Sequence, residues 1–119
     1  MRLQCLMVTR DPTLLSHLKA NLSEHRVSLD LRGDSASAIE LAARRHWDGL
    51  VIDCDSVPGG MEVIAQVRNS RSNKQTLILA VVNGLTSADT AIEGGANFVL
   101  SKPIQENRLR GFSISRFPR

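Results

Sequence analysis

Apolar runs of strand length alternate with segments of helical periodicity along this chain. The strand-like runs cover residues 3–9, 27–31, 49–53, 75–82 and 97–101. The run 49–53 is nearly all apolar, which is typical of a strand buried on both faces of a parallel sheet. The helical segments between them cover residues 11–22, 36–47, 61–68 and 86–94. Because strand and helix alternate, the pattern predicts an α/β fold in which helices cover both sides of a parallel sheet.

The first two helical segments have identifiable starts. Asp11 can cap the first helix, with Pro12 at its first position, and Asp34 or Ser35 can cap the second. The positions that helical periodicity places toward the core are Leu14, Leu15, Leu18 and Leu22 in the first helix and Ile39, Ala42, Ala43 and His46 in the second.

The final segment, QENRLRGFSISRFPR, breaks the pattern. It should supply a fifth helix, yet Gly111 comes early and Pro118 ends the segment, which leaves about two helical turns. We therefore expect one domain over residues 1–104. Residues 105–119 are expected to form a short last helix and a basic tail or linker, truncated from a longer protein.

The composition, with 42% hydrophobic and 23% charged residues in 119, is that of a folded globular chain. The first 100 residues hold ten Lys/Arg and eleven Asp/Glu, whereas the last 19 hold five and one, so the net charge of +3 belongs to the tail. That tail has no helix-turn-helix pattern, and we expect no direct contact with nucleic acid. No apolar run has membrane-spanning length, and Cys5 and Cys54 lack the spacing of a metal or redox motif. We expect a cytoplasmic protein with reduced thiols, away from the membrane.

Four polar residues stand where strands of the predicted sheet end. Thr9 and Arg10 follow the first strand, Asp53 ends the third, and Lys102 follows the fifth. In an open α/β sheet, ligands bind beyond the carboxyl ends of the strands, where the strand order reverses. In the strand order that the family resemblance given below implies, the first and third strands flank that point. Thr9, Arg10 and Asp53 should therefore be neighbours, and Lys102 should reach toward them.

Two segments carry a resemblance to bacterial response-regulator receiver domains. GANFVLSKPI around Lys102 resembles the family's GADDYLTKPF without a gap, and Asp53 lies five residues after Asp48, as in the family's DLVLLD strand. The resemblance implies a flavodoxin-like (βα)5 fold, a doubly wound parallel sheet with strand order 2-1-3-4-5. It also implies that Asp53 is the phosphoacceptor and Lys102 the active-site lysine, although counting back from Pro58 would place Cys54 at the acceptor position. In receivers, the acceptor and an acidic pair hold the Mg²⁺ that phosphoryl transfer requires.

The chain departs from this family at several functional positions. The changed positions are the acidic pair, now Thr9 and Arg10, the switch hydroxyl, now Ala80 or Val82, and the aromatic switch residue, now Val99. Loss of two carboxylates removes most of the negative charge that would hold Mg²⁺ and adds a guanidinium near the acceptor. We expect no metal or only weak Mg²⁺ binding, and no other cofactor.

The charges near Asp53 suggest two arrangements of the site. Asp11 and Asp55 are acids that could compensate for the lost pair, although Asp11 suits the cap of the first helix better. Arg10 could pair with Asp53 or Asp55 and fill the space of the metal and the phosphoryl group, or it could point into solvent. A pair between Arg10 and Asp53 or Asp55 would lock the site, and this is the hypothesis of a locked site.

The expected function is that of a degenerate receiver, or pseudo-receiver, which is a bacterial two-component signalling module and no enzyme. Its phosphorylation would be impaired, and it would act by docking to a partner or an attached output domain, or as a homodimer through the face of helix four, strand five and helix five. The combination of DCD, VVNG, GANFVLSKPI and a tail ending near SRFPR is also similar to receiver-like domains that precede PilZ domains, which makes PilZ one candidate output. Two alternatives stay open: a working phosphorelay receiver that uses Asp53, and a redox or small-anion module that uses Cys54 or Arg10.

Overall fold

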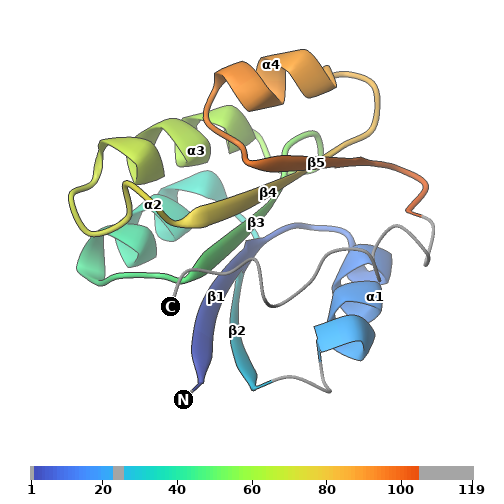
Figure 1. Cartoon of the computed structure of the whole chain (residues 1–119). Helices are drawn as coiled ribbons and strands as arrows, with labels where there is room; N and C mark the ends of the chain where they lie inside the picture. The colour runs from blue at the N-terminus through green and yellow to red at the C-terminus, as the bar shows by residue number, and fades with distance from the viewer. Residues whose placement is uncertain (1, 23–25, 105–119) are drawn as a thin grey trace.

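The computed structural model describes residues 2–22 and 26–104, which form a five-stranded parallel sheet with helices between the strands (Figure 1). The strands are β1 (Leu3–Val8), β2 (Val27–Arg32), β3 (Gly49–Asp53), β4 (Leu77–Val82) and β5 (Phe98–Ser101). The helices are α1 (Pro12–Leu22), α2 (Ser35–Arg44), α3 (Gly60–Asn69) and α4 (Ala88–Glu93). The strand order is β2-β1-β3-β4-β5, so the predicted flavodoxin-like fold is confirmed.

Two hydrophobic cores lie on the two faces of the sheet. Helices α2, α3 and α4 cover one face, where Ile52 and Ala80 are fully buried. Helix α1 packs on the opposite face, against Met7 and Val51 (Figure 1). Of the predicted core positions, Leu14, Leu18 and Ala42 are buried, and Leu15 and Ile39 are partly buried against the cores. The side chain of Leu22 lies outside the described part of the structure.

The structure confirms the helix caps that the sequence predicts. Asp11 caps α1, because its Oδ1 accepts hydrogen bonds from the backbone N–H groups of Thr13 at 3.0 Å and Leu14 at 3.4 Å. Of the two candidates at the start of α2, Asp34 is the cap, and its Oδ2 accepts from a backbone N–H three residues on, at 2.8 Å. Both caps fix the point at which the chain turns from a strand end into a helix.

Helix α2 ends earlier than predicted, and two of its predicted core positions are wrong. It ends at Arg44, and Ala43 and His46 are exposed. The physical reason is a long-range contact that the local pattern does not contain. Trp47 enters the core after the helix, and its backbone N–H donates to Oδ1 of the fully buried Asn73 at 2.7 Å.

The predicted fifth helix and basic tail, residues 105–119, lie outside the described residues. The described chain leaves β5 through a cis peptide bond between Lys102 and Pro103 and ends at Ile104. Within residues 2–22 and 26–104, no helix has the length and apolar character needed to cross a membrane.

Candidate functional site

The carboxyl ends of three strands bring Thr9, Asp53 and Lys102 together. Strands β1 and β3 pair in register with Val8 opposite Ile52, so the next residues, Thr9 and Asp53, lie side by side. Because side chains alternate along a strand, both belong to the face of the sheet that α1 covers. Lys102 follows β5 directly and reaches across to them. The predicted neighbourhood of these three residues is confirmed.

Asp53 is enclosed by hydrogen-bond donors at one of its two carboxylate oxygens. Its side chain is 1% exposed. Oδ2 accepts from the Thr9 hydroxyl at 2.7 Å, the Ser56 hydroxyl at 2.8 Å and the Lys102 ammonium at 2.9 Å. Oδ1 is buried and has no hydrogen-bond partner among the described residues. A buried carboxylate of this kind requires a close counter-charge.

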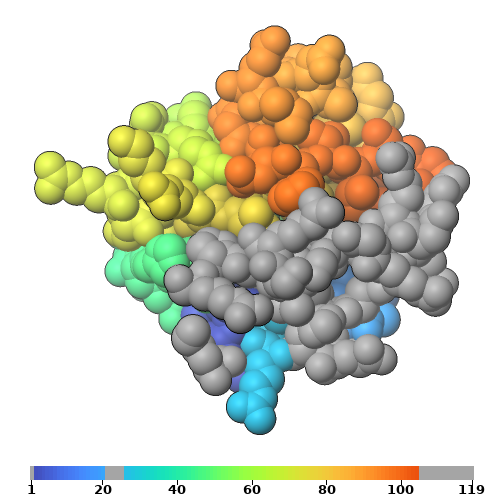
Figure 2. Space-filling view, viewed as in Figure 1, coloured from blue at the N-terminus to red at the C-terminus, as the bar shows by residue number. Residues whose placement is uncertain are grey.

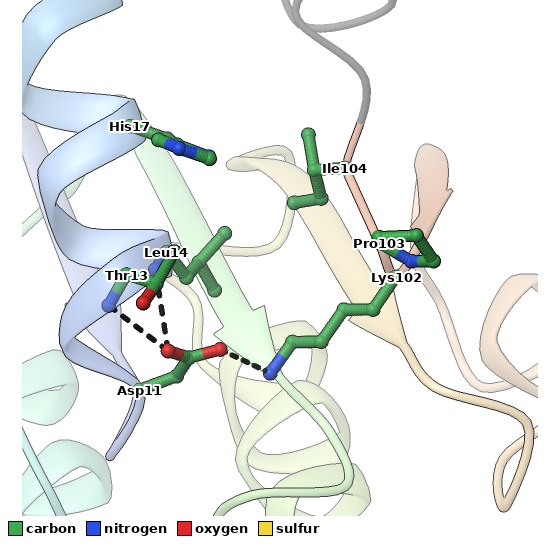
Figure 3. A pocket seen from close by; sticks show the side chains of 7 residues that line it. All are labelled: Asp11, Thr13, Leu14, His17, Lys102, Pro103 and Ile104. Atoms are coloured by element: carbon green, nitrogen blue, oxygen red, sulfur yellow. Dashed lines mark hydrogen bonds and ion pairs between the residues drawn. The ribbon is translucent and has the colours of Figure 1, made fainter.

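Lys102 supplies that counter-charge and shares it with Asp11. Its Nζ lies 2.8 Å from Asp11 Oδ2 and 2.9 Å from Asp53 Oδ2, and Figure 3 shows the side chain extending from the end of β5 toward the start of α1. Burial opposes the charge of Lys102, but the bonds to two carboxylates prevail and raise its pKa above 10.5. The hydrogen bond from Lys102 lowers the pKa of Asp11 below 3.8. Both side chains therefore keep their charges across neutral pH.

An open cavity of about 460 Å³ adjoins this ion pair, between α1 and the end of β5 (Figure 3). Asp11 and Lys102 form its polar edge, and Leu14 and Ile104 line its apolar part. Asp53 does not line the cavity. The opening therefore leads to the Asp11–Lys102 pair and not to the buried carboxylate.

Arg10 does not enter the site, so of its two predicted arrangements the exposed one is found and the pair with Asp53 or Asp55 does not form. The Arg10 side chain is exposed, and its Nε donates to the backbone carbonyl of Gly33 at 2.8 Å. This carbonyl belongs to the loop after β2, which lies beside the end of β1. The loop holds the guanidinium away from Asp53, and among the described residues the cation in contact with Asp53 is Lys102.

Asp55 faces the loop between β4 and α4. Its Oδ2 accepts from the backbone N–H of Asn83 at 2.7 Å, and its Oδ1 accepts from the hydroxyl of Thr86 at 2.6 Å and the backbone N–H of Thr86 at 3.1 Å. Partial burial opposes ionisation of Asp55, but these hydrogen bonds outweigh it and lower the pKa. Both carboxylate oxygens are therefore engaged in holding this loop.

Cys54 does not take the place of Asp53. Its Sγ is buried, 3.8 Å from the carbonyl of Ile52, in the core beneath α2 and α3. Burial, with a smaller effect from Asp55 and Asp53, raises the pKa of this thiol to about 11. A redox-sensitive thiol needs a lowered pKa. The environment of Cys54 therefore opposes the redox alternative.

The remaining predicted positions lie around β4 and β5. Val82 ends β4, Ala80 is buried two residues earlier, and Val99 is partly buried against the same core. Besides Thr9, the hydroxyls of Ser56 and Thr86 bond the carboxylates of Asp53 and Asp55, and sequence reasoning missed both. Their signal in the sequence is weak: each stands in a short polar loop after a strand, where Ser and Thr commonly bond nearby groups.

The residues at this site do not fit the magnesium ion that the receiver resemblance implies. Among residues 2–22 and 26–104, no group of three or more His, Cys, Asp or Glu side chains is placed to hold a metal ion. The two carboxylates that approach each other, Asp11 and Asp53, already share the ammonium of Lys102. A second cation there would be repelled by the first. An added small anion would meet two carboxylates against one ammonium, which is also unfavourable.

No family model matches the chain, but its sequence is similar to curated signalling proteins. It is 29% identical over 109 residues to the response regulator MprA of Mycobacterium leprae, covering 90% of this chain and 47% of that protein. It is 29% identical over 110 residues to the autoinducer 2 sensor kinase/phosphatase LuxQ of Vibrio parahaemolyticus, covering 90% of this chain and 13% of that protein. The chain thus spans about half or less of the length of these relatives.

Solved receiver structures share the fold. The receiver domain of a sensor histidine kinase from Pseudomonas aeruginosa, with a magnesium ion coordinated in its active site cleft, has a TM-score of 0.77 at 22% identity and covers 93% of both chains. A chemotaxis response regulator of Vibrio cholerae has a TM-score of 0.78 at 20% identity, with 92% of this chain and 93% of that chain covered. This chain therefore has the fold of these receiver domains and a sequence similar to that of response regulators.

Proposed function

We propose that this chain is a receiver-like signalling domain with impaired Mg²⁺-dependent phosphorylation, which acts by docking to a protein partner or an attached output domain. The observation that carries the proposal is the enclosure of Asp53. Its side chain is 1% exposed, and its Oδ2 accepts bonds from Thr9, Ser56 and Lys102. Phosphoryl transfer needs an acceptor oxygen in line with the leaving group of the donor. The covered oxygen cannot offer that geometry unless its partners move.

A second candidate, phosphoacceptance at Asp53 without the acidic pair, is favoured by one observation. Oδ1 of Asp53 has no hydrogen-bond partner among the described residues. A carboxylate oxygen without a donor keeps the lone pairs that a nucleophile uses. The same oxygen is buried, so a phosphoryl donor would have to open the site to reach it. The two candidates therefore differ in whether Asp53 accepts a phosphoryl group.

Incubation with acetyl phosphate and Mg²⁺, read by intact mass, tests that event. We expect the wild-type chain to gain no phosphoryl group, and we expect beryllofluoride to leave its melting temperature unchanged. Asp53→Asn serves as the control that defines background modification. Stoichiometric addition of one phosphoryl group that Asp53→Asn abolishes would overturn the proposal in favour of the phosphoaccepting receiver.

Restoring the acidic pair gives the complementary test. Thr9→Asp combined with Arg10→Asp returns two carboxylates to the end of β1, next to Asp53 in the register of the sheet. Added negative charge there favours a divalent cation. We expect the double variant to acquire a Mg²⁺-dependent rise in melting temperature and a phosphoryl group on Asp53. A double variant that folds and remains inert would show that loss of the acidic pair is not what disables the site.

The docking part of the proposal is supported by apolar side chains near α4 and β5. Leu85 is 84% exposed and Ile92 is 48% exposed, and the orange surface in Figure 2 shows the α4–β5 region that carries this part of the chain. We propose that this region joins a second copy or an output domain, with PilZ as one candidate output. If it joins a second copy, Leu85→Ser with Ile92→Ser should lower the mass seen by light scattering. Leu31→Ser, exposed by 41% on β2, is the matched control. Equal masses for all three chains, all dimeric, would place the contact elsewhere.

A further inference from the structure

One ammonium joins three separate elements of this fold at the candidate site. Nζ of Lys102, at the end of β5, contacts Asp53 at the end of β3 and Asp11 at the start of α1, at 2.9 and 2.8 Å. The side chains of Lys102 and Asp11 are 21% and 29% exposed, and that of Asp53 is 1% exposed. The contact is therefore mostly shielded from solvent, where ionic interactions are stronger than at an open surface.

Lys102 occupies the electrostatic role that a bound metal ion would have. Asp53 is buried and needs a positive neighbour, and the guanidinium of Arg10 is held at Gly33 instead. An ammonium is a compact charge with three donors, so it can bond two carboxylates at once. Two of those donors point at Asp11 and Asp53. The site thus carries its own cation, covalently tethered to β5.

Asp11 holds this cation in place without giving up its role as a helix cap. Its Oδ1 accepts from the first backbone N–H groups of α1, and its Oδ2 accepts from Lys102. One carboxylate oxygen of Asp11 therefore caps the helix, and the other binds the ammonium of Lys102. The helix start fixes Asp11, and Asp11 fixes the ammonium beside Asp53.

We propose that Asp11, Lys102 and Asp53 form a latch in which the lysine replaces the divalent cation and fixes the site in one state. The inference rests on the proposed function, because both require that Asp53 be closed to Mg²⁺, and it adds the residues that close it. The latch binds β5 to the β1–α1 turn independently of metal ions and phosphoryl donors. Removing the ammonium leaves two adjacent carboxylates, which is a ligand set that a divalent cation can occupy.

Lys102→Met tests the latch, because methionine keeps much of the side-chain volume and removes the charge. We expect the melting temperature of this variant to fall by roughly 5–15 °C in the presence of EDTA. We expect about 10 mM MgCl₂ or CaCl₂ to restore at least part of the loss, because a ligand that binds only the folded state stabilises it. The wild-type chain should show no such response. Lys74→Met, at an exposed lysine, is the matched control and should behave as wild type.

A second pair of variants keeps the test decisive if Lys102→Met does not fold. Asp11→Asn and Asp34→Asn both replace the cap of a helix by an equally good cap, but only Asp11 bonds an ammonium. We expect Asp11→Asn to lower the melting temperature more than Asp34→Asn. Where Lys102→Met does fold, adding Asp11→Asn to it should abolish its response to divalent cations. Equal effects of the two cap variants, a folded Lys102→Met that ignores divalent cations, or a wild-type chain that responds to them would each overturn the latch.

The latch and the proposed function fail separately. Phosphorylation of Asp53 in the wild-type chain would overturn the proposed function, whatever the variants show. A wild-type chain that resists acetyl phosphate, together with a Lys102→Met variant that ignores divalent cations, would overturn the latch and leave the proposed function standing. The first result is read by mass and the second by melting temperature, so neither depends on the other.

Discussion

At the scale of single residues, the hydroxyl of Thr9 links the candidate acceptor to the first helix. Thr9 Oγ1 donates to Asp53 Oδ2 at 2.7 Å and accepts from the backbone N–H of Asp11 at 2.9 Å. Thr9→Val keeps the shape and removes both bonds. Because the residue is buried, we expect the free energy of unfolding to fall by about 1–3 kcal/mol, measured by urea denaturation. Thr13→Val, at an exposed position four residues on, should change it by less than about 0.5 kcal/mol. Equal losses in the two variants would mean that the Thr9 bonds contribute nothing specific.

The Asp11–Lys102 pair also gives stability a defined dependence on pH. The lowered pKa of Asp11 means that its contribution is present above its unfolded value near 3.8 and is lost as the pH falls through the folded pKa. The raised pKa of Lys102 means that its contribution is lost as the pH rises through a value above 10.5. Asp55, whose pKa is also lowered, adds to the acid limb.

Asp11→Asn should therefore flatten the acid limb of the stability curve. We expect its free energy of unfolding to vary less than that of the wild type between about pH 5 and pH 2, because one of the carboxylates that must be protonated is missing. Urea denaturation at each pH gives the two curves. Parallel curves over that interval would show that the Asp11 carboxylate does not differ between the folded and unfolded states.

Arg10 marks the limit of what the sequence could predict at this scale. Strand ends placed Thr9, Asp53 and Lys102 together, because the register of a parallel sheet depends on the apolar pattern. The direction of Arg10 depends instead on the carbonyl of Gly33, which belongs to a different loop. No local pattern in the sequence encodes that partner, so the site and Lys102 could be located while the direction of the Arg10 side chain stayed open.

At the scale of elements, Arg68 of α3 fastens the helix to the loops that lead into β4 and β5. Its Nε donates to the carbonyl of Gly95 at 2.9 Å, one terminal nitrogen donates to that of Thr76 at 2.6 Å, and the other donates to Asn97 Oδ1 at 2.7 Å. Gly95 has a φ of 122°, and a Cβ there would lie 2.8 Å from the Arg68 side chain. Glycine is thus required both by the backbone conformation and by this packing.

Replacing the guanidinium of Arg68, whose three nitrogens form a fork of donors, tests this connection. Arg68→Lys retains the charge but offers one nitrogen in place of three, so several carbonyls lose their donor. We expect the free energy of unfolding to fall by about 1–3 kcal/mol in urea denaturation. Arg71→Lys, at an exposed arginine after the same helix, should leave it nearly unchanged. An Arg68→Lys variant as stable as Arg71→Lys would show that the fork is dispensable.

Elements defined by long apolar runs could be predicted, and those ended by distant contacts could not. Strand β3 is buried at all five positions, which is why its run was unambiguous. The end of α2 was misplaced because the pattern of Ala and Arg continues past Arg44. There the buried side chain of Asn73 accepts a hydrogen bond from the backbone N–H of Trp47, 26 residues earlier in the chain, and this bond is incompatible with a continued helix. A contact at that separation leaves no local periodicity.

At the scale of the whole molecule, the two ends of the sheet hold separate polar networks. The carboxyl end holds the Asp11–Lys102–Asp53 latch, and the amino end holds a buried network around Asn73, whose Nδ2 donates to the carbonyl of Ala42 at 2.7 Å. The apolar body of the sheet lies between them. Because the second network uses none of the residues of the first, the fold can keep its structural hydrogen bonds while the candidate site diverges.

Trp47 permits a test of that separation, because it is the only tryptophan of the chain and lies at the amino end. It is 1% exposed, and the guanidinium of Arg45 lies 4.1 Å from the centroid of its ring. Strand β3 begins two residues after Trp47 and ends at Asp53, and five residues of extended strand span about 15 Å. We expect the native fluorescence of Trp47 to be the same in the wild type and in Lys102→Met, and to change in Arg45→Ala, which removes the neighbouring charge. Unfolding in urea should shift the emission of all three chains to the red. A change in the native emission of Lys102→Met would mean that the latch at one end of β3 alters packing at the other, and the two ends would then have to be treated as one coupled unit.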